Sequence, residues 1–152
     1  MHFLSEDDIV DIDTVRQIIT DTGIKVRNLE RLPGGSRSYA FAADNLVIRF
    51  PKAEIIWQTM CREKKIIDMI YPYIEDKMPD KVHKIELISE TYPFSVSKRF
   101  CGKICDNRRQ GELTTGYSAL NAVQQENLAR QIAKFFALMH AIDYETLDIP
   151  PV

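Results

Sequence analysis

The sequence has 152 residues, of which 45% are hydrophobic and 28% are charged. This length fits one domain, or one lobe with part of a second, and the composition is that of a globular protein with a substantial core. The formal net charge of −2 and the pI near 5.9 give no support to a nucleic-acid-binding protein, which usually carries a basic stripe.

The chain shows no pattern typical of a membrane span or a secretion signal. Its apolar runs are short compared with the stretch that a bilayer-spanning helix needs. Residues 1–8 lack a basic region followed by an apolar one, so no signal peptide is predicted. We therefore expect a cytoplasmic protein that binds neither membrane nor nucleic acid.

The cysteines give no indication of a disulfide framework or a metal site. Cys61, Cys101 and Cys105 are an odd number. Cys101 and Cys105 lie close together, but no second pair or histidine cluster accompanies them, and a zinc site normally needs more ligands. We expect reduced thiols and no metal site in this chain.

The first predicted element is an amphipathic helix that ends near Gly23. Ser5, followed by acidic residues 6–8, is typical of a helix N-cap and first turn. Apolar residues then recur with helical spacing at Ile9, Ile12, Val15, Ile18 and Ile19.

Strand-like segments follow this helix and are separated by turn residues. They span residues 24–32, 38–43 and 46–50. Pro33 and the two glycines after it separate the first segment from the second. The Asp44-Asn45 pair predicts a hairpin turn between the second segment and the third.

The second half of the chain predicts a helix, two strands and a final helix. A long helix begins at residue 53 or 54 and is expected to end at residue 70, before Pro72. Strands are predicted over residues 82–88 and 94–99, followed by a polar connection over residues 101–116. An amphipathic helix over residues 123–142 carries Leu128, Ile132, Phe135, Phe136, Met139 and Ile142 at helical spacing.

The loop between the first two strands is a candidate anion site. Gly34 and Gly35 let the backbone turn sharply and approach a ligand, and exposed N–H groups in such a turn can bind an anion. Ser36, Arg37 and Ser38 could add hydroxyl and guanidinium contacts. The residues of this loop taken alone favour an ordinary hairpin loop, because the Gly-Lys-Ser of a P-loop is absent.

Arg49 and Glu63 are candidates for an ion pair between a strand and a helix. Strand alternation places Val47 and Arg49 on the same face of the third strand. Glu63 interrupts the apolar stripe of the following helix, so it should face the sheet, and an unpaired buried charge would be costly. A solvated sheet face, or a pair that is purely structural, would account for the same residues.

These features together resemble the start of the aminoglycoside phosphotransferases, a kinase-like family. The similar segments are Gly34-Gly35-Ser36-Arg37-Ser38-Tyr39 and residues 46–52, 62–64, 94–102 and 128–143. The resemblance implies an α+β fold with a protein-kinase-like N-lobe, in which a five-stranded antiparallel sheet packs on one main helix. An N-terminal helix and a C-terminal amphipathic helix would complete it, with the N-lobe over residues 1–100 and a linker and the first helix of a truncated second lobe over residues 101–152.

The resemblance also implies a site for ATP or GTP with Mg²⁺. Arg49 would contact the nucleotide phosphates and Glu63 would orient it. The other implied nucleotide-binding residues are Gly34, Gly35, Ser36, Arg37 and Ser38 over the phosphates, Val47 on the third strand, and Lys98, Arg99, Phe100 and Cys101 at the base. The acceptor would be an aminoglycoside or another small hydroxylated molecule, and the activity would confer antibiotic resistance.

The chain departs from the family in two respects. Arginine stands at residue 49, where the family often has lysine, and the two differ in reach and hydration. The His-x-Asp catalytic loop and the metal-binding aspartate motif are absent, and His140 fits a structural role at a helix end better. We therefore expect no catalytic residue and no phosphate transfer by this chain alone, with the base and metal ligands in a missing half.

The alternative is a non-catalytic kinase-like module for binding or self-association. In the family, the helix equivalent to residues 123–142 packs on the lobe that is missing here. The face with Phe135, Phe136 and Met139 would then be an exposed apolar patch that needs a partner.

Overall fold

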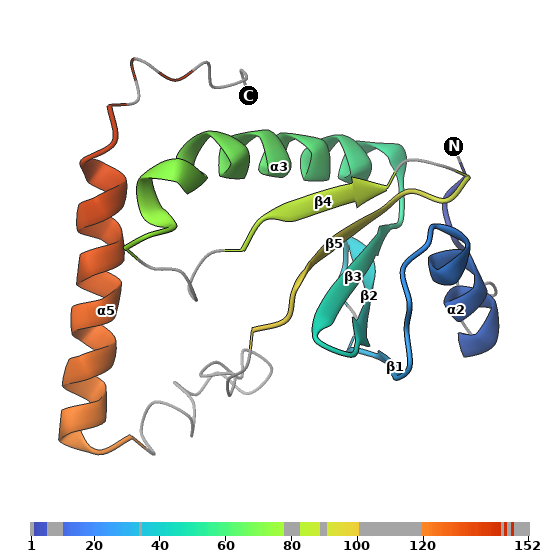
Figure 1. Ribbon diagram of the computed structural model, residues 1–152, viewed down its shortest axis with the longest axis horizontal. Helices are drawn as coiled ribbons and strands as arrows, with labels where there is room; N and C mark the ends of the chain where they lie inside the picture. Colours follow the sequence, from blue (N-terminus) through green and yellow to red (C-terminus); the bar gives the residue numbers. More distant parts are fainter. Residues whose placement is uncertain are drawn as a thin grey trace.

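The computed structural model describes residues 2–5, 11–33, 35–77, 83–88, 91–100, 120–143, 145 and 147. Its elements in chain order are α2 (Ile12–Asp21), β1 (Leu29–Arg31), β2 (Ser38–Ala43), β3 (Leu46–Pro51), α3 (Glu54–Ile74), β4 (Ile85–Ile88), β5 (Phe94–Lys98) and α5 (Ala122–His140) (Figure 1). The α+β class and the order of helices and strands are as predicted.

The strands form a single five-stranded sheet in the order β1-β2-β3-β5-β4. Every neighbouring pair is antiparallel, which confirms the predicted sheet. β3 lies at the centre, where Ile48 is opposite Phe41 of β2 and Val96 of β5. Residues 46–49 of β3 therefore have strand neighbours on both sides, whereas Phe50 and Pro51 pair with β2 alone.

One face of the sheet is closed by a core shared with α2. Ile48 and Phe50 of β3 are fully buried there with Val15 and Ile19 of α2. The ring of Phe50 lies 5.9 Å from that of Phe41 and 5.0 Å from that of Phe94, between centroids. Alternation along β3 therefore sends Val47 and Arg49 to the opposite face, on the side of α3.

The turn between β2 and β3 is the predicted hairpin. Asp44 has φ of +51°, a left-handed conformation that aspartate tolerates better than most residues. Its carboxylate accepts hydrogen bonds from the backbone N–H groups of Arg27 and Asn28, each at 3.0 Å. The bond from Arg27 and then that from Asn28 hold the pKa of Asp44 below its usual value.

The first strand is much shorter than the predicted segment 24–32. Only Leu29–Arg31 pairs with β2, although Ile24 and Val26 do pack against the core. Arg16 of α2 donates from Nη1 to the carbonyl oxygens of Val26 and Arg27, at 3.3 and 3.0 Å. β1 cannot extend further back along β2, because Leu29 already lies opposite Ala43, the last residue of β2 before the turn. The Arg16 side chain instead satisfies the carbonyls of Val26 and Arg27.

The first helix also differs from its predicted start. α2 begins at Ile12, and the Asp11 carboxylate caps it by accepting from the N–H of Asp13 and the hydroxyl of Thr14. Ser5 lies before this helix without helical structure, and residues 6–10 are outside the described part. The cap is therefore Asp11 for the helix that the structure describes.

The prediction that the long helix ends before Pro72 was wrong, because α3 continues through this proline to Ile74. A proline inside a helix removes a backbone hydrogen bond and costs about 3 kcal/mol. The continuation brings Ile74, which is fully buried, into a cluster with Ile70 and with Ile142, beyond the end of α5. Burial of one such side chain contributes about 1.5–3 kcal/mol, which is comparable to the cost of the proline.

The last helix, α5, lies at the end of α3 and away from the strands (Figure 1). It starts with a capping box in which Asn121 and Gln124 each accept from the other's backbone N–H, both at 3.0 Å. Leu138 and Met139 contact the Ile70–Ile74 cluster, but no described residue of α5 is buried. Across the described part of the chain, we find no helix with the length and apolar character needed to span a membrane.

We expect Ile48→Ala to lower the free energy of unfolding by about 2–5 kcal/mol, because it opens a cavity in the core between the sheet and α2. Chemical denaturation measures this change. The matched control is Ile55→Ala, which makes the same substitution at a side chain that is 65% exposed, and should change stability by about 0.5 kcal/mol or less. Equal losses in both variants would contradict the assigned core.

Candidate functional site

The site is centred on Arg49, on the sheet face that α2 does not cover. Register places Arg49 between Ala40 of β2 and Ser95 of β5. Val47, two residues earlier on the same face, lies between Ala42 and Ser97 in the same way. All four flanking side chains are small, so the long Arg49 side chain can extend over this face without obstruction from its strand neighbours.

Arg49 contacts α3 and β5 at the same time. Its Nη2 lies 3.2 Å from Oε2 of Glu63, which forms the predicted ion pair. Its Nε donates to the hydroxyl oxygen of Ser95 at 3.3 Å. The guanidinium is therefore held by two elements that are distant in the sequence.

The ion pair remains accessible to solvent. The side chains of Arg49 and Glu63 are 32% and 45% exposed. An ion pair with this exposure contributes only about 0–1 kcal/mol to stability, because water screens it. A cation that is held in place and still reachable by solvent is suited to binding an anionic group.

The loop between β1 and β2 borders the same end of β3. The carbonyl of Arg37 accepts from the N–H of Lys52, just after β3, at 3.1 Å, and Ser36 and Arg37 are exposed. A Cβ added to Gly35 would meet only the carbonyl oxygen of Ser38, at an ordinary 3.8 Å. The packing of the protein does not itself require glycine at residue 35, and Gly34 lies outside the described residues.

The predicted base-binding segment begins where β5 ends. Lys98 lies opposite Leu46, and the N–H of Arg99 donates to the carbonyl of Asn45 at 2.7 Å. Phe100 stacks on His83, with ring centroids 4.2 Å apart. Cys101 is outside the described residues. These contacts place residues 98–100 at the start of β3, beside Leu46 and next to Val47.

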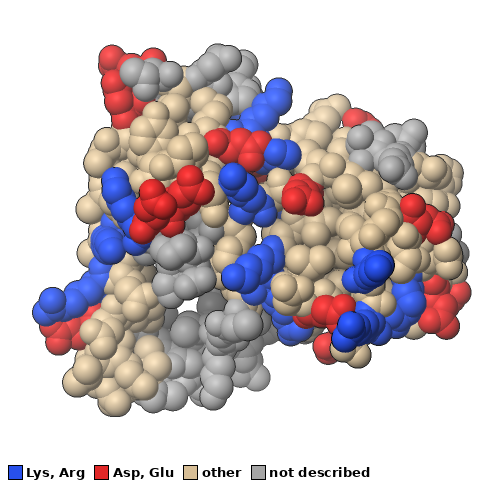
Figure 2. Space-filling model, viewed as in Figure 1, with Lys and Arg blue, Asp and Glu red and all other residues tan. Residues whose placement is uncertain are grey.

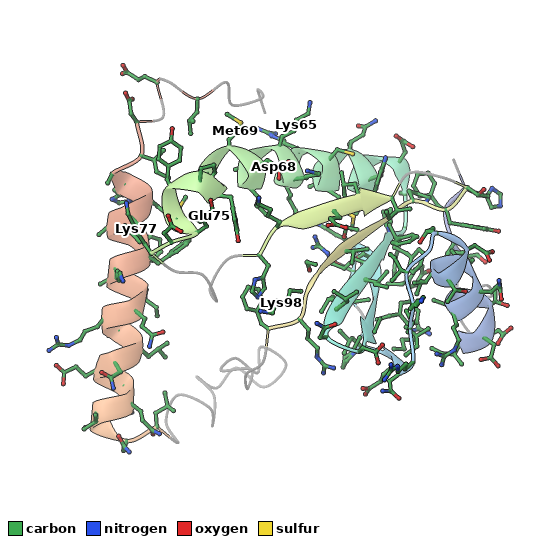
Figure 3. The ribbon with its side chains drawn as sticks, viewed as in Figure 1. Lys65, Asp68, Met69, Glu75, Lys77 and Lys98 are labelled. Carbon is green, nitrogen blue, oxygen red and sulfur yellow. The ribbon has the colours of Figure 1, made fainter. Side chains whose placement is uncertain are left out.

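A pocket of about 360 Å³ lies at this end of the sheet, where Figure 3 places Lys98. Lys84 and Lys98 line it together with apolar side chains that include Leu46. Neither Arg49 nor Glu63 is among its described lining residues. The pocket is therefore separate from the Arg49–Glu63 pair.

Charges of both signs are mixed over the face that Figure 2 shows. Lys and Arg side chains alternate there with Asp and Glu. Two ion pairs join residues one turn apart on helices, Lys64 with Asp68 on α3 and Arg130 with Glu126 on α5. The view shows no continuous basic stripe of the kind that nucleic-acid binding requires.

The described residues contain no group of three or more metal-ligating side chains. Cys61 is a partly buried thiol, and burial, followed by the nearby Glu54, raises its pKa above the usual value. It is therefore protonated at neutral pH and is a poor ligand or nucleophile in that form. Cys105, like Cys101, lies outside the described part of the chain.

Sequence reasoning missed Ser95, which is 2% exposed and bonded to Arg49. The only signal is that Ser95 and Ser97 alternate with apolar Phe94 and Val96 along β5. Alternation predicts a polar face of this strand but does not show which residue of β3 lies opposite. The predicted roles of the site residues in nucleotide binding stay predictions.

No protein-family model and no curated protein sequence matches the chain. Solved structures of similar fold do exist. The GDP complex of wild-type aminoglycoside 2'-phosphotransferase-IIIa matches with a TM-score of 0.65 and 22% identity, over 88% of this chain and 42% of that one. ADP-bound aminoglycoside phosphotransferase APH(2'')-Ib matches with a TM-score of 0.59 and 20% identity, over 87% and 41%.

A third match is the streptomycin-ATP-APH(2")-IIa ternary complex, with a TM-score of 0.55 and 18% identity, over 96% of this chain and 44% of that one. The chain thus spans less than half the length of these proteins. At these identities the likeness establishes the fold, which is the kinase-like arrangement of a five-stranded antiparallel sheet and its helices.

We expect Glu63→Gln to change the free energy of unfolding by less than about 1 kcal/mol, because the ion pair is partly exposed. Chemical denaturation measures this change. Glu75→Gln is the control, since it makes the same charge change at the C-cap of α3, near α5 (Figure 3). A loss of several kcal/mol in Glu63→Gln alone would contradict a solvent-screened pair.

Proposed function

We propose that this chain is the nucleotide-binding portion of a phosphotransferase that moves the γ-phosphoryl group of ATP or GTP to a hydroxyl of a small acceptor. The observation that carries the proposal is Arg49, held by Glu63 on the accessible face of the sheet. It is supported by the fold, which this chain shares with phosphotransferases solved with GDP, ADP or ATP.

In this proposal, the phosphates lie between Arg49 and the loop of residues 34–38. The guanidinium presents N–H donors in a planar fork that matches phosphate oxygens. Backbone N–H groups of the loop and the side chain of Arg37 would contact the same phosphates from the other side. Glu63 fixes the direction of Arg49, so the cation does not have to be ordered when the nucleotide binds.

The base would lie against Val47 and the segment of residues 98–101. The backbone of residues 98–101 would supply N–H and C=O groups that recognise the edge of a base, apart from the N–H of Arg99, which donates to Asn45. Val47 is flanked by the small side chains of Ala42 and Ser97, which leave the surface flat enough for a planar ring. This arrangement does not select between ATP and GTP.

The remaining chemistry would come from residues outside this chain. Phosphoryl transfer needs Mg²⁺ and a residue that orients the acceptor hydroxyl. The described residues include no cluster of metal ligands, and the sequence has no His-x-Asp catalytic motif. We propose that residues 1–100 form the nucleotide lobe, that residues 101–152 lead into a second lobe, and that the second lobe supplies these groups and the pocket for an aminoglycoside-like acceptor.

Titration of the chain with Mg-ATP and Mg-GTP, followed by amide chemical shifts, tests the proposal. We expect shifts at residues 35–38, Val47, Arg49 and residues 98–100. Arg49→Ala should raise Kd by about tenfold to a hundredfold, because it removes a charge-assisted contact to phosphate. Arg130→Ala, the same change on the exposed side of α5, should leave Kd unchanged. No shifts at millimolar nucleotide would contradict the proposal.

The exposed apolar side chains of α5 favour a second candidate function, a module for self-association. Ile132 and Phe136, one turn apart on α5, are 48% and 54% exposed. Phe135 and Phe136 pack edge to face with centroids 5.9 Å apart, and Met139 lies one turn further along the helix. An apolar patch of this kind on a surface is typical of an interface.

Light scattering over a range of protein concentrations tests self-association. If α5 pairs with a second copy, the mass should rise with concentration, and Phe136→Ser should reduce this rise because it removes apolar surface from the interface. Ile55→Ser, at an exposed residue of α3, is the control and should have no effect on association. A monomer at every concentration would rule out this candidate.

A further inference from the structure

The bond between Arg49 and Ser95 differs in kind from the ion pair with Glu63. Nε lies where the guanidinium joins the aliphatic stem, whereas Nη2 lies at the tip. A bond at the tip alone leaves the planar group free to rotate about the bond that carries Nε. A second bond at Nε, 3.3 Å from the buried Ser95 oxygen, fixes the plane of the group.

The two bonds use one edge of the guanidinium and leave the other open. Nε and Nη2 are occupied by Ser95 and Glu63. Among the residues that the structure describes, none accepts a hydrogen bond from Nη1. Because the plane is fixed, the direction in which the Nη1 donors point is fixed as well, and these donors remain for a ligand.

Lysine could not use this arrangement in the same way. Its ammonium carries three donors on a single nitrogen at the tip of a flexible stem, so a bond to Ser95 would not orient a planar group. The plane that Ser95 fixes exists only if residue 49 is arginine. This role accounts for the buried Ser95, which is 2% exposed and lies directly opposite Arg49 on the neighbouring strand.

We propose that Ser95 is a positioning residue, which acts through Arg49 by fixing the guanidinium plane so that Nη1 faces the nucleotide phosphates. The proposal rests on the proposed nucleotide-binding function for its ligand. It makes Ser95 and Arg49 a matched pair, in which the serine has no effect on phosphate binding without the arginine.

The geometry can be tested without nucleotide. The Nε–Hε resonance of Arg49 is assigned by its loss in Arg49→Lys, and its exchange with water is then measured. Ser95→Ala should speed this exchange by about tenfold, which corresponds to the loss of one hydrogen bond. Ser97→Ala, the same substitution two residues along the same face, should leave it unchanged. Equal exchange in the wild type and Ser95→Ala would overturn the proposal.

The positioning role is tested by a double-mutant cycle with Mg-ATP. Ser95→Ala should raise Kd by about fivefold when residue 49 is arginine, and by less than about twofold in the Arg49→Lys background. Thermal melts of all four proteins establish that each is folded at the titration temperature. The same fold-change in both backgrounds would show a general structural effect and would overturn the pairing of Ser95 with Arg49.

The two experiments separate failure of this inference from failure of the proposed function. If the wild-type chain binds no nucleotide, the proposed function fails, and the exchange measurement still decides whether Ser95 fixes Arg49. If the chain binds nucleotide but the cycle shows no coupling, the proposed function stands and the positioning role of Ser95 is wrong.

Discussion

The candidate site depends on the placement of one positive charge, that of Arg49, on a central strand. β3 has neighbours on both sides, so its side chains point either into the α2 core or toward α3. A guanidinium on the second face needs an acceptor, and Glu63 supplies it from the middle of α3. Glu63 therefore faces the sheet, although the partly exposed pair contributes little to the stability of this arrangement. Ser95 on β5 completes the set of contacts.

The two faces of the sheet therefore differ in structure, since one forms the core with α2 and the other carries the ion pair. On the α2 side, Phe41, Ile48 and Phe50 are buried to within about one per cent of their surface. On the other side, the small residues Ala42 and Ser95 are buried beside β3, whereas the ion pair of Arg49 with Glu63 stays partly exposed. Stability that comes from one face allows the other to keep an exposed charge pair, which contributes little to folding and is available for a ligand.

The last helix has only a limited connection to the rest of the molecule. α5 is held to α3 by a small cluster around Ile74 and Ile142, and its own apolar side chains remain largely exposed. The solved structures of similar fold are more than twice as long as this chain. An exposed helix of this kind is consistent with both proposals, the nucleotide-binding lobe and the self-association module. The two differ in whether the apolar surface of α5 pairs with a second copy of the chain.

Local patterns in the sequence predicted the elements that depend on residues close together in the chain. Alternation and the Asp44 turn predict β2 and β3 almost to the residue, and helical spacing predicts that Glu63 faces inward. The ion pair with Arg49 could therefore be predicted, because both partners are the exceptions in otherwise apolar patterns. The family resemblance then supplied the arrangement of the sheet.

Tertiary contacts decided the rest, since their partners are distant in the chain. Burial of Ile74 carries α3 past Pro72, and the end of β2 at Ala43, opposite Leu29, limits β1 to three residues. Ser95 meets Arg49 only through the register of two strands, across a separation of 46 residues in sequence. Spacing along a chain determines which face a residue occupies, whereas folding alone determines which residue it meets there.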